Sequence, residues 1–193
     1  MKNFLLVIVL LMIILLFGCT QQTAIEDPTE PMKEDNSIEL PVEESKETSG
    51  IDWKESQLKD VITGNTFRIS DFKGKPILLE SFAVWCPTCT KQQKVIKELH
   101  EELGDEVISI SLDTDPNEDE SQVLQHTQKN GFDWRYAVST VGTTKALIFE
   151  FGNTVVNAPQ APVILICKDQ SARLLGRDIK DVEELKWEIE KGC

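Results

Sequence analysis

The sequence is poor in cysteine, histidine and positive charge, and each shortage argues against a class of protein. Five cysteines in 193 residues are too few and too scattered for a disulfide scaffold. A structural zinc ion needs four ligands, and the sequence has only one Cys-x-x-Cys and no histidine pair. Lys and Arg number 20 against 33 Asp and Glu, and the resulting net charge of −13 argues against a nucleic-acid partner.

The longest apolar run lies near the N-terminus and is short for a membrane-spanning helix. It extends from Phe4 to Phe17, follows Lys2 and precedes Gly18-Cys19. A spanning helix needs about 17–25 apolar residues, so residues 1–19 are predicted to be a secretory signal peptide or an uncleaved membrane anchor. The residues before Cys19 resemble a lipoprotein signal, which implies lipidation of Cys19, although Phe17 replaces the usual small residue.

The composition changes twice after this segment. Residues 20–50 are rich in Glu, Pro, Thr and Ser and contain nine acidic and two basic residues. Such a segment cannot bury enough apolar surface to offset the entropy cost of ordering. We expect a disordered acidic tether there and one globular domain over residues 51–193. Either N-terminal alternative places this domain at the extracytoplasmic face of the cell membrane.

The globular part is organised around the stretch from Ile77 to Cys89. Its apolar start, rich in branched residues, predicts a buried strand, and its end is Cys86-Pro87-Thr88-Cys89. Apolar residues then recur at helical spacing up to Leu103, so both cysteines are expected in the first turn of a helix. Pro87 suits an early helical position, because its missing N–H has no partner to lose there.

This placement predicts redox chemistry. The N–H groups and the positive dipole end of a helix N-terminus favour a thiolate, so the pKa of Cys86 is expected to be lowered. Cys89 lies one helical turn further on, close enough to close a small disulfide ring. Such a pair can attack a substrate disulfide, hold it as a mixed disulfide and then release it. The alternative, half of a zinc site, lacks a second pair of ligands.

The stretch from Leu58 to Lys191 resembles the thioredoxin superfamily, in particular its membrane-anchored TlpA-like thiol-disulfide oxidoreductases. The resemblance rests on Trp85-Cys86-Pro87-Thr88-Cys89, on residues 64–76 before it and on residues 161–166 after it. It implies a thioredoxin-like α/β fold with a central mixed β-sheet flanked by helices. It also implies protein thiol or disulfide substrates, a membrane thiol electron donor, and no metal or cofactor besides the Cys86–Cys89 disulfide.

Glu80 is the third candidate for chemistry. It lies on the predicted central strand, six residues before Cys86 and among apolar neighbours, so burial is expected to raise its pKa. In thioredoxins the matching position holds a buried acidic residue, which implies that Glu80 accepts the proton of the resolving thiol, Cys89. Strand alternation leaves open that Glu80 points instead to solvent or to the sheet edge.

The resemblance also implies a substrate-binding surface beside the cysteines. Pro162 would follow a cis peptide bond and present the backbone of Ala161 to an extended substrate segment. Trp85 would cover the thiol pair as an apolar lid. Pro87 and Thr88 would form the dipeptide that tunes the pair.

Elsewhere, strands and helices alternate and the chain closes with a hairpin and a helix, which favours an α/β sandwich with a mixed sheet. A short hairpin is expected over residues 61–69. The other strands are expected at 77–83, 107–112, 134–138, 163–167 and 173–175. Helices are expected at 86–103, 118–129 and 143–151 and after Asp181.

Three further features are less specific. Cys167 reads as a buried small side chain, or as the partner of Cys193 in a disulfide. The acidic loop over residues 113–119 resembles a calcium loop but lacks the required Gly and Glu, so we expect it to cap a helix. His100 and His126 are expected at the helix surface.

The sequence therefore predicts a thiol-disulfide oxidoreductase with Cys86 as nucleophile, Cys89 as resolving thiol and Glu80 as proton relay. Glu80 and the lack of a histidine between the cysteines favour reduction, and the resemblance implies apocytochrome c among the substrates. One alternative is an oxidant that introduces disulfides. Another is a peroxiredoxin, although the Pro and Thr that its signature places upstream of the peroxidatic cysteine are replaced here by Leu79 and Ala83. A copper chaperone and a redox-inert binding module also stay open.

Overall fold

The computed structural model describes residues 50 and 52–193. The predicted signal or anchor over residues 1–19 lies outside these residues, and so does the predicted tether apart from Gly50. Within the described residues, none of the helices combines the length and the apolar composition needed to cross a membrane.

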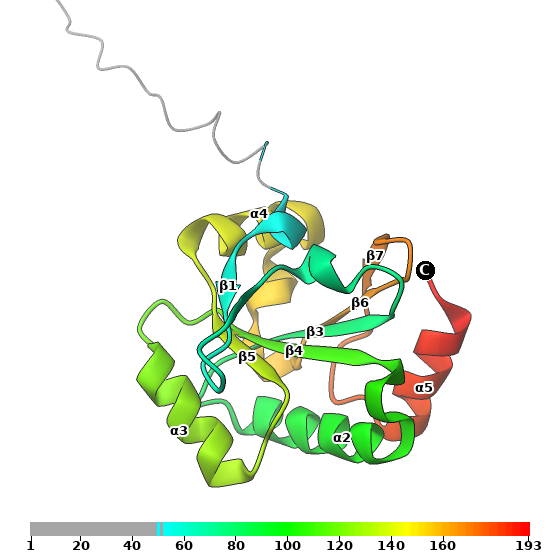
Figure 1. Cartoon of the computed structure of the whole chain (residues 1–193), viewed down its shortest axis with the longest axis horizontal. Coiled ribbons are helices and arrows are strands. Elements are labelled where there is room, and N and C mark those ends of the chain that lie inside the picture. The colour runs from blue at the N-terminus through cyan, green and yellow to red at the C-terminus, as the bar shows by residue number, and fades with distance from the viewer. Residues whose placement is uncertain (1–49, 51) are drawn as a thin grey trace, which may run out of the picture. The chain divides into compact units, whose positions relative to one another are not determined.

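A five-stranded sheet with the order β5-β4-β3-β6-β7 forms the centre of the domain (Figure 1). Its central strand pairs in parallel with β4, which pairs in parallel with β5, whereas β6 runs antiparallel to both β3 and β7. The predicted mixed sheet is therefore confirmed. The strands are β3 (Ile77–Phe82), β4 (Ile108–Asp113), β5 (Arg135–Val138), β6 (Val163–Ile166) and β7 (Ala172–Leu174).

Helices cover both faces of this sheet (Figure 1). One face carries α2 (Pro87–Leu103), α3 (Glu120–Asn130) and α5 (Val182–Lys191), and the other carries α4 (Val141–Phe151). Because strand side chains alternate between the faces, Leu78 and Phe82 pack in the α2 layer, whereas Ile77 and Leu79 pack in the α4 layer. By this alternation Glu80 belongs to the same layer as α2.

The boundaries of the helices follow from their caps. Asp119 caps α3 and forms a capping box with Gln122, and Gly131 ends the helix in the left-handed conformation with φ 67°. The predicted capping role of the acidic loop is thus confirmed. Thr140 caps α4, and Asp181 caps α5 by accepting the backbone N–H of Glu184.

The predicted hairpin over residues 61–69 is displaced toward the N-terminus. Its strands are β1 (Leu58–Lys59) and β2 (Thr66–Phe67), so Val61 lies in the turn. The reason is Asp60, whose carboxylate accepts the Ile62 N–H and the Thr63 hydroxyl and so holds the turn there. The short 3₁₀ helices are η2 (Trp53–Glu55), η3 (Ile69–Phe72), η4 (Gly104–Glu106), η5 (Asn153–Val156) and η6 (Ala158–Gln160).

The prediction that both histidines lie at the surface is wrong. His126 is buried, with Nε2 2.7 Å from Oε1 of Gln93, and its ring packs against Phe82. His100 is half-buried, with Nε2 2.8 Å from the Ser109 hydroxyl. Both residues lie on helix faces that meet the sheet, and burial lowers the pKa of each ring.

Candidate active site

The two cysteines of the Cys-x-x-Cys motif lie at the N-terminus of α2. Cys86 is the N-cap residue, and its Sγ accepts the backbone N–H of Cys89 at 3.1 Å. The two side chains are joined in a disulfide with a Cα–Cα distance of 5.4 Å, and both residues are buried. The motif thus sits at the helix start that its sequence predicts. On reduction, the N–H of Cys89 and the helix dipole would stabilise a thiolate at Cys86.

Glu80 lies fully buried on β3, which leads into this motif. Burial raises the pKa of its carboxyl group to about 8, while the nearby amide of Gln93, the Ser111 hydroxyl and Lys180 lower it in part. The Ser111 hydroxyl donates to Oε2 at 2.9 Å. The alternative in which Glu80 points to solvent or to the sheet edge is wrong, because position 80 shares the inward face of Leu78 and Phe82.

The surroundings of Glu80 are polar groups inside an apolar layer. Trp134, the residue before β5, donates from Nε1 to the Ser111 hydroxyl at 3.0 Å, which leaves that hydroxyl's own proton for Glu80. Within the described residues, Oε1 of Glu80 and Nε2 of Gln93 have no hydrogen-bond partner. Glu80 therefore keeps one oxygen available to gain or lose a proton, which suits a relay.

The segment before β6 lies directly beside the cysteine pair. The Ala158 carbonyl oxygen is 3.2 Å from Sγ of Cys89, and the Pro162 carbonyl accepts the backbone N–H of Ser81 at the end of β3. Both Ala161 and Pro162 are buried. The structure therefore brings this turn to the cysteines, as the resemblance implied.

Two details of this turn differ from the prediction. The peptide bond before Pro162 is trans, like all peptide bonds of the described residues. Ala161 adopts the left-handed conformation, with φ 45° and ψ 58°. The backbone of Ala161 is also already bonded within the protein, its N–H to the Ala158 carbonyl and its carbonyl to Nζ of Lys180. Substrate contact through Ala161 stays a prediction: its N–H would have to leave the Ala158 carbonyl, whereas its carbonyl oxygen can accept a second hydrogen bond.

Trp85 lies at the surface, 60% exposed, and its Nε1 donates to Asp115 at 2.7 Å. Glu118, in the same acidic loop as Asp115, accepts the Val84 N–H at its Oε2 at 2.7 Å. The acidic loop thus fixes the residues that immediately precede Cys86, a link with no signal in the sequence. Whether Trp85 covers the thiol pair in a complex stays a prediction.

The other residues of the motif differ in exposure. Pro87 is exposed and Thr88 is half-buried, so the outer surface of the dipeptide can meet a partner.

A metal centre has no candidate among residues 50 and 52–193, where no group of three or more His, Cys, Asp or Glu side chains is placed to hold an ion. In the acidic loop, Asp113 is buried at the end of β4. Burial raises the pKa of its carboxyl group to about 7, and the nearby carboxylates of Glu118 and Asp115 add to the effect. The loop therefore carries less negative charge near neutral pH than its composition suggests.

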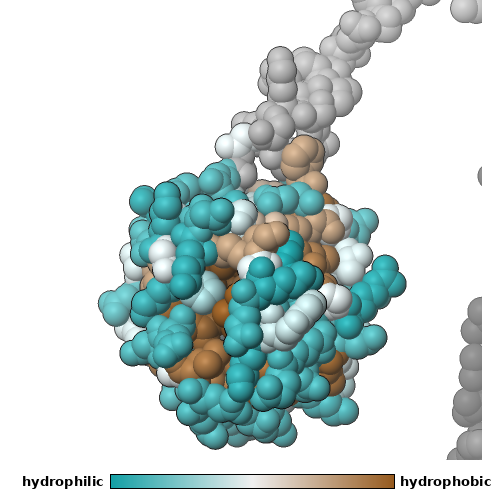
Figure 2. Space-filling model, turned by 90° about the vertical axis from the view of Figure 1, so that its right-hand side faces the viewer, coloured by the Kyte–Doolittle hydropathy of each residue, from teal (hydrophilic) through white to brown (hydrophobic). Residues whose placement is uncertain are grey.

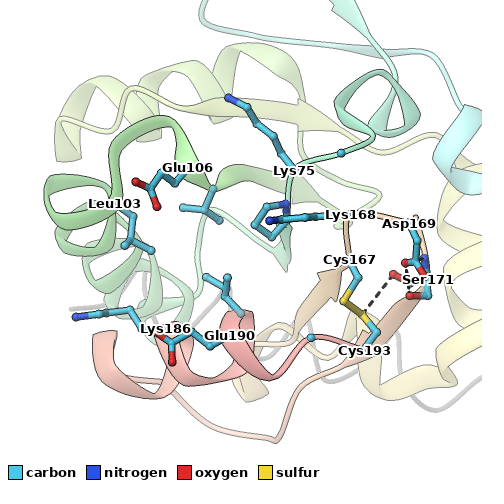
Figure 3. Close-up of a pocket in the computed structure, with 15 residues that line it drawn as sticks. Lys75, Leu103, Glu106, Cys167, Lys168, Asp169, Ser171, Lys186, Glu190 and Cys193 are labelled. Carbon is cyan, nitrogen blue, oxygen red and sulfur yellow. Dashed lines mark hydrogen bonds between the residues drawn. A yellow bond between two sulfur atoms is a disulfide. The ribbon is translucent and has the colours of Figure 1, made fainter.

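Cys167 and Cys193 form a second disulfide, with a Cα–Cα distance of 5.9 Å. It adjoins a pocket of about 780 Å³ between α5 and the residues just before β3 (Figure 3). Figure 2 views this side of the domain, where hydrophobic residues show between hydrophilic ones. Because Ile166 pairs with Ile77 at the start of β3, this disulfide lies at the opposite end of the sheet from Cys86.

Comparison with characterised proteins agrees with this geometry. Residues 50–170 match the Redoxin family model. Among curated relatives, a thiol-disulfide oxidoreductase ResA of Oceanobacillus iheyensis is 28% identical over 85 residues, covering 42% of each chain. A thiol:disulfide interchange protein DsbE of Vibrio cholerae is 27% identical over 148 residues, covering 69% of this chain and 73% of the relative.

The fold is also found among solved structures. A secreted disulfide oxidoreductase of Mycobacterium tuberculosis, described as homologous to DsbE, superposes with a TM-score of 0.57 at 14% identity, over 72% of this chain and 97% of the other. At that identity the similarity establishes the fold alone. Since the family model covers well over half of the sequence, the chain belongs to the Redoxin family, within the thioredoxin superfamily.

Proposed function

We propose that this protein is an extracytoplasmic thiol-disulfide oxidoreductase that reduces disulfides in exported proteins through Cys86 and Cys89. The observation that carries the proposal is a cysteine pair at the N-terminus of α2, in the same layer of the domain as a buried carboxyl group of raised pKa. Both curated relatives are named for thiol-disulfide exchange, although the matched stretch spans 42% of the first and 73% of the second. An N-terminal signal or anchor in residues 1–19 would supply the location.

The reaction begins with both cysteines reduced. The Cys86 thiolate attacks one sulfur of the substrate disulfide, forms a mixed disulfide and releases one substrate thiolate. Cys89 then loses its proton to the Glu80 carboxylate and attacks Sγ of Cys86. This step closes the Cys86–Cys89 disulfide and releases the second substrate thiolate, so two electrons pass from the protein to the substrate. A membrane thiol donor would reduce the pair again.

The pKa of Glu80 suits this role. A value of about 8 lies close to the ordinary pKa of a cysteine thiol, about 8.5. Proton transfer from a thiol to Glu80 is then far less unfavourable than transfer to an ordinary carboxylate, which suits general acid–base catalysis. Glu80 would return the proton to Cys89 if the protein worked as an oxidant, so its pKa gives no support to the expectation that this residue favours reduction.

Trapping and potential measurements test the proposal. In a Cys89→Ser variant, the mixed disulfide should accumulate on Cys86 when a disulfide-containing peptide is added, whereas Cys86→Ser should form none. A reduction potential of the pair near −270 mV would support a reductase and one near −120 mV an oxidant. Failure of the Cys89→Ser variant to form any adduct would overturn the oxidoreductase function itself.

The substrate class is proposed separately. The resemblance to TlpA-like proteins suggests apocytochrome c cysteines as one substrate. Reduction of an oxidised peptide that carries a haem-attachment Cys-x-x-Cys-His motif tests it, with a scrambled peptide disulfide as control. Equal rates on both peptides would argue for a general reductase.

A further inference from the structure

Lys180 is a fully buried lysine that the sequence did not single out. It lies in the segment between β7 and α5 with no exposed surface. A buried ammonium group is costly and rare in proteins, because burial removes its hydration. Its position therefore calls for partners that compensate this cost.

Those partners belong to the candidate active site. Nζ donates to the Ala161 carbonyl at 2.7 Å, which fixes the turn before Pro162. The main chain of Lys180 is held from α2, where Gln92 accepts from its N–H at 2.8 Å and donates to its carbonyl at 3.2 Å. Gln92 lies within one turn of Cys89 on the same helix. Lys180 thus connects the helix that carries the cysteines to the turn beside them.

Lys180 also lies near Glu80 in the fold, because Ala161, which accepts from its Nζ, stands two residues before Val163, the register partner of Glu80 between β6 and β3. Lys180 lowers the pKa of Glu80, and Glu80 favours the charged form of Lys180 in return. The net pKa of Lys180 is lowered to about 8, because burial outweighs the attraction of Glu184, Glu80 and Asp178. Tyr136 is a further ionisable neighbour of Glu80, and burial keeps it neutral by raising its pKa.

We propose that Lys180 is a positioning residue for thiol-disulfide exchange, which holds the Ala161–Pro162 turn against the cysteine pair and places its cation beside the segment that pairs with Glu80. The inference rests on the proposed function, since it assigns to Lys180 the control of the proton relay. The Lys180 cation stabilises the Glu80 carboxylate, the form that accepts the Cys89 proton. Removing the cation would make that form available only at higher pH.

The experiment separates the two thiol steps on the full chain. The reduced protein in excess is mixed with an aromatic disulfide whose thiolate product is coloured. Attack by Cys86 releases the first thiolate, and attack by Cys89 on the mixed disulfide releases the second. The rate of the second release is measured against pH.

For Lys180→Met, the pH midpoint of the second release is expected to rise by about one unit. Lys180→Arg, which keeps the cation, should have the same pH midpoint as the unaltered chain. The matched control is Lys186→Met on α5. The Nζ of Lys186 pairs with Glu102 and Glu183, so this substitution should leave the midpoint unchanged. In a Glu80→Gln background, Lys180→Met should shift nothing further.

The outcomes are distinct. If the unaltered chain gives no second release that depends on Cys89, the proposed function fails. If it does, and Lys180→Met slows the reaction equally at every pH, Lys180 has only a structural role and the inference is overturned. Should Lys180→Met not fold, an NMR titration of the unaltered chain replaces it. The Glu80 carboxyl and Lys180 ammonium resonances must then each respond to the ionisation of the other, and independent titrations would reject the inference.

Discussion

At the scale of single residues, the chemistry depends on one carboxyl group inside an apolar layer. The alternation of β3 places Glu80 with Leu78 and Phe82, which is why its burial could be predicted from sequence. Its partners could not be predicted. Gln93 sits in a Lys- and Gln-rich stretch that reads as a solvent face, and Lys180 sits in a charged stretch, with Asp178 and Asp181 close in sequence, that reads as a surface turn. Only the packing of α2 and α5 on the sheet buries both.

The raised pKa of Glu80 predicts how stability depends on pH. The folded protein holds a proton on Glu80 up to about pH 8, whereas the unfolded chain releases it near 4.5. Stability from this group is therefore complete below pH 4.5 and is lost as pH rises through 8. The loss between pH 5 and 8 is on the order of 4 kcal/mol in the free energy of unfolding.

Urea unfolding at a series of pH values checks this expectation. The unaltered protein should lose stability over that range, and Glu80→Gln, which stays neutral and can still accept from Ser111, should lose about 4 kcal/mol less. Asp113 titrates in the same direction with a pKa raised to about 7, so the difference between the two proteins isolates Glu80. If the free energy of unfolding changed with pH by the same amount in both proteins, burial of an ionisable Glu80 would be contradicted.

At the scale of elements, the sequence predicted whether each segment is a helix or a strand better than it predicted the residues at which the segment begins and ends. The cysteine helix ends at Leu103 in both prediction and structure, because apolar spacing and Gly104 mark that end. The first hairpin was displaced because the Asp60 turn, which has no strand pattern, decides its register. Pairing of Cys167 with Cys193 stayed open in the sequence, since geometry and not spacing decides whether two cysteines can bond.

That second disulfide attaches α5 to the sheet. It joins Cys167, the residue after β6, to Cys193, two residues beyond the end of α5, and encloses a long loop, with a sequence separation of 26. Closing such a loop restricts the unfolded chain, so replacing both cysteines with serine should cost about 3–4 kcal/mol of stability. The control is the double serine variant of Cys86 and Cys89, whose separation of 3 predicts a smaller loss, about 2 kcal/mol.

Thermal and urea unfolding of the two double variants measure both losses. The Cys167/Cys193 variant should keep the Cys86-dependent exchange reaction, because its disulfide lies at the other end of the sheet. An equal or smaller loss than in the control would show that the second disulfide does not hold α5 in place.

At the scale of the whole molecule, the two disulfides occupy opposite ends of one sheet and differ in what their reduction changes. Reduction of Cys86–Cys89 leaves a thiolate that the N-terminus of α2 stabilises, through the Cys89 N–H in particular. Among the described residues, no N–H donor bonds to Sγ of Cys167 or Cys193, and reduction of this disulfide releases the tie on α5. The same fold therefore favours the reduced form of one pair and the oxidised form of the other.

This asymmetry predicts the order of reduction at equilibrium. Across a series of dithiol buffers, the Cys86–Cys89 pair should become reduced at a higher potential than the Cys167–Cys193 pair, although Cys193 is exposed and Cys86 is buried. Trapping free thiols with an alkylating reagent, followed by mass spectrometry of the peptides, assigns each transition to its pair. Because exposure governs the rate of attack and stabilisation of the products governs the equilibrium, samples must be equilibrated from both the oxidised and the reduced side. A reversed order would mean that the helix N-terminus does not stabilise the Cys86 thiolate, and the chemistry proposed for this end of the sheet would lose its physical basis.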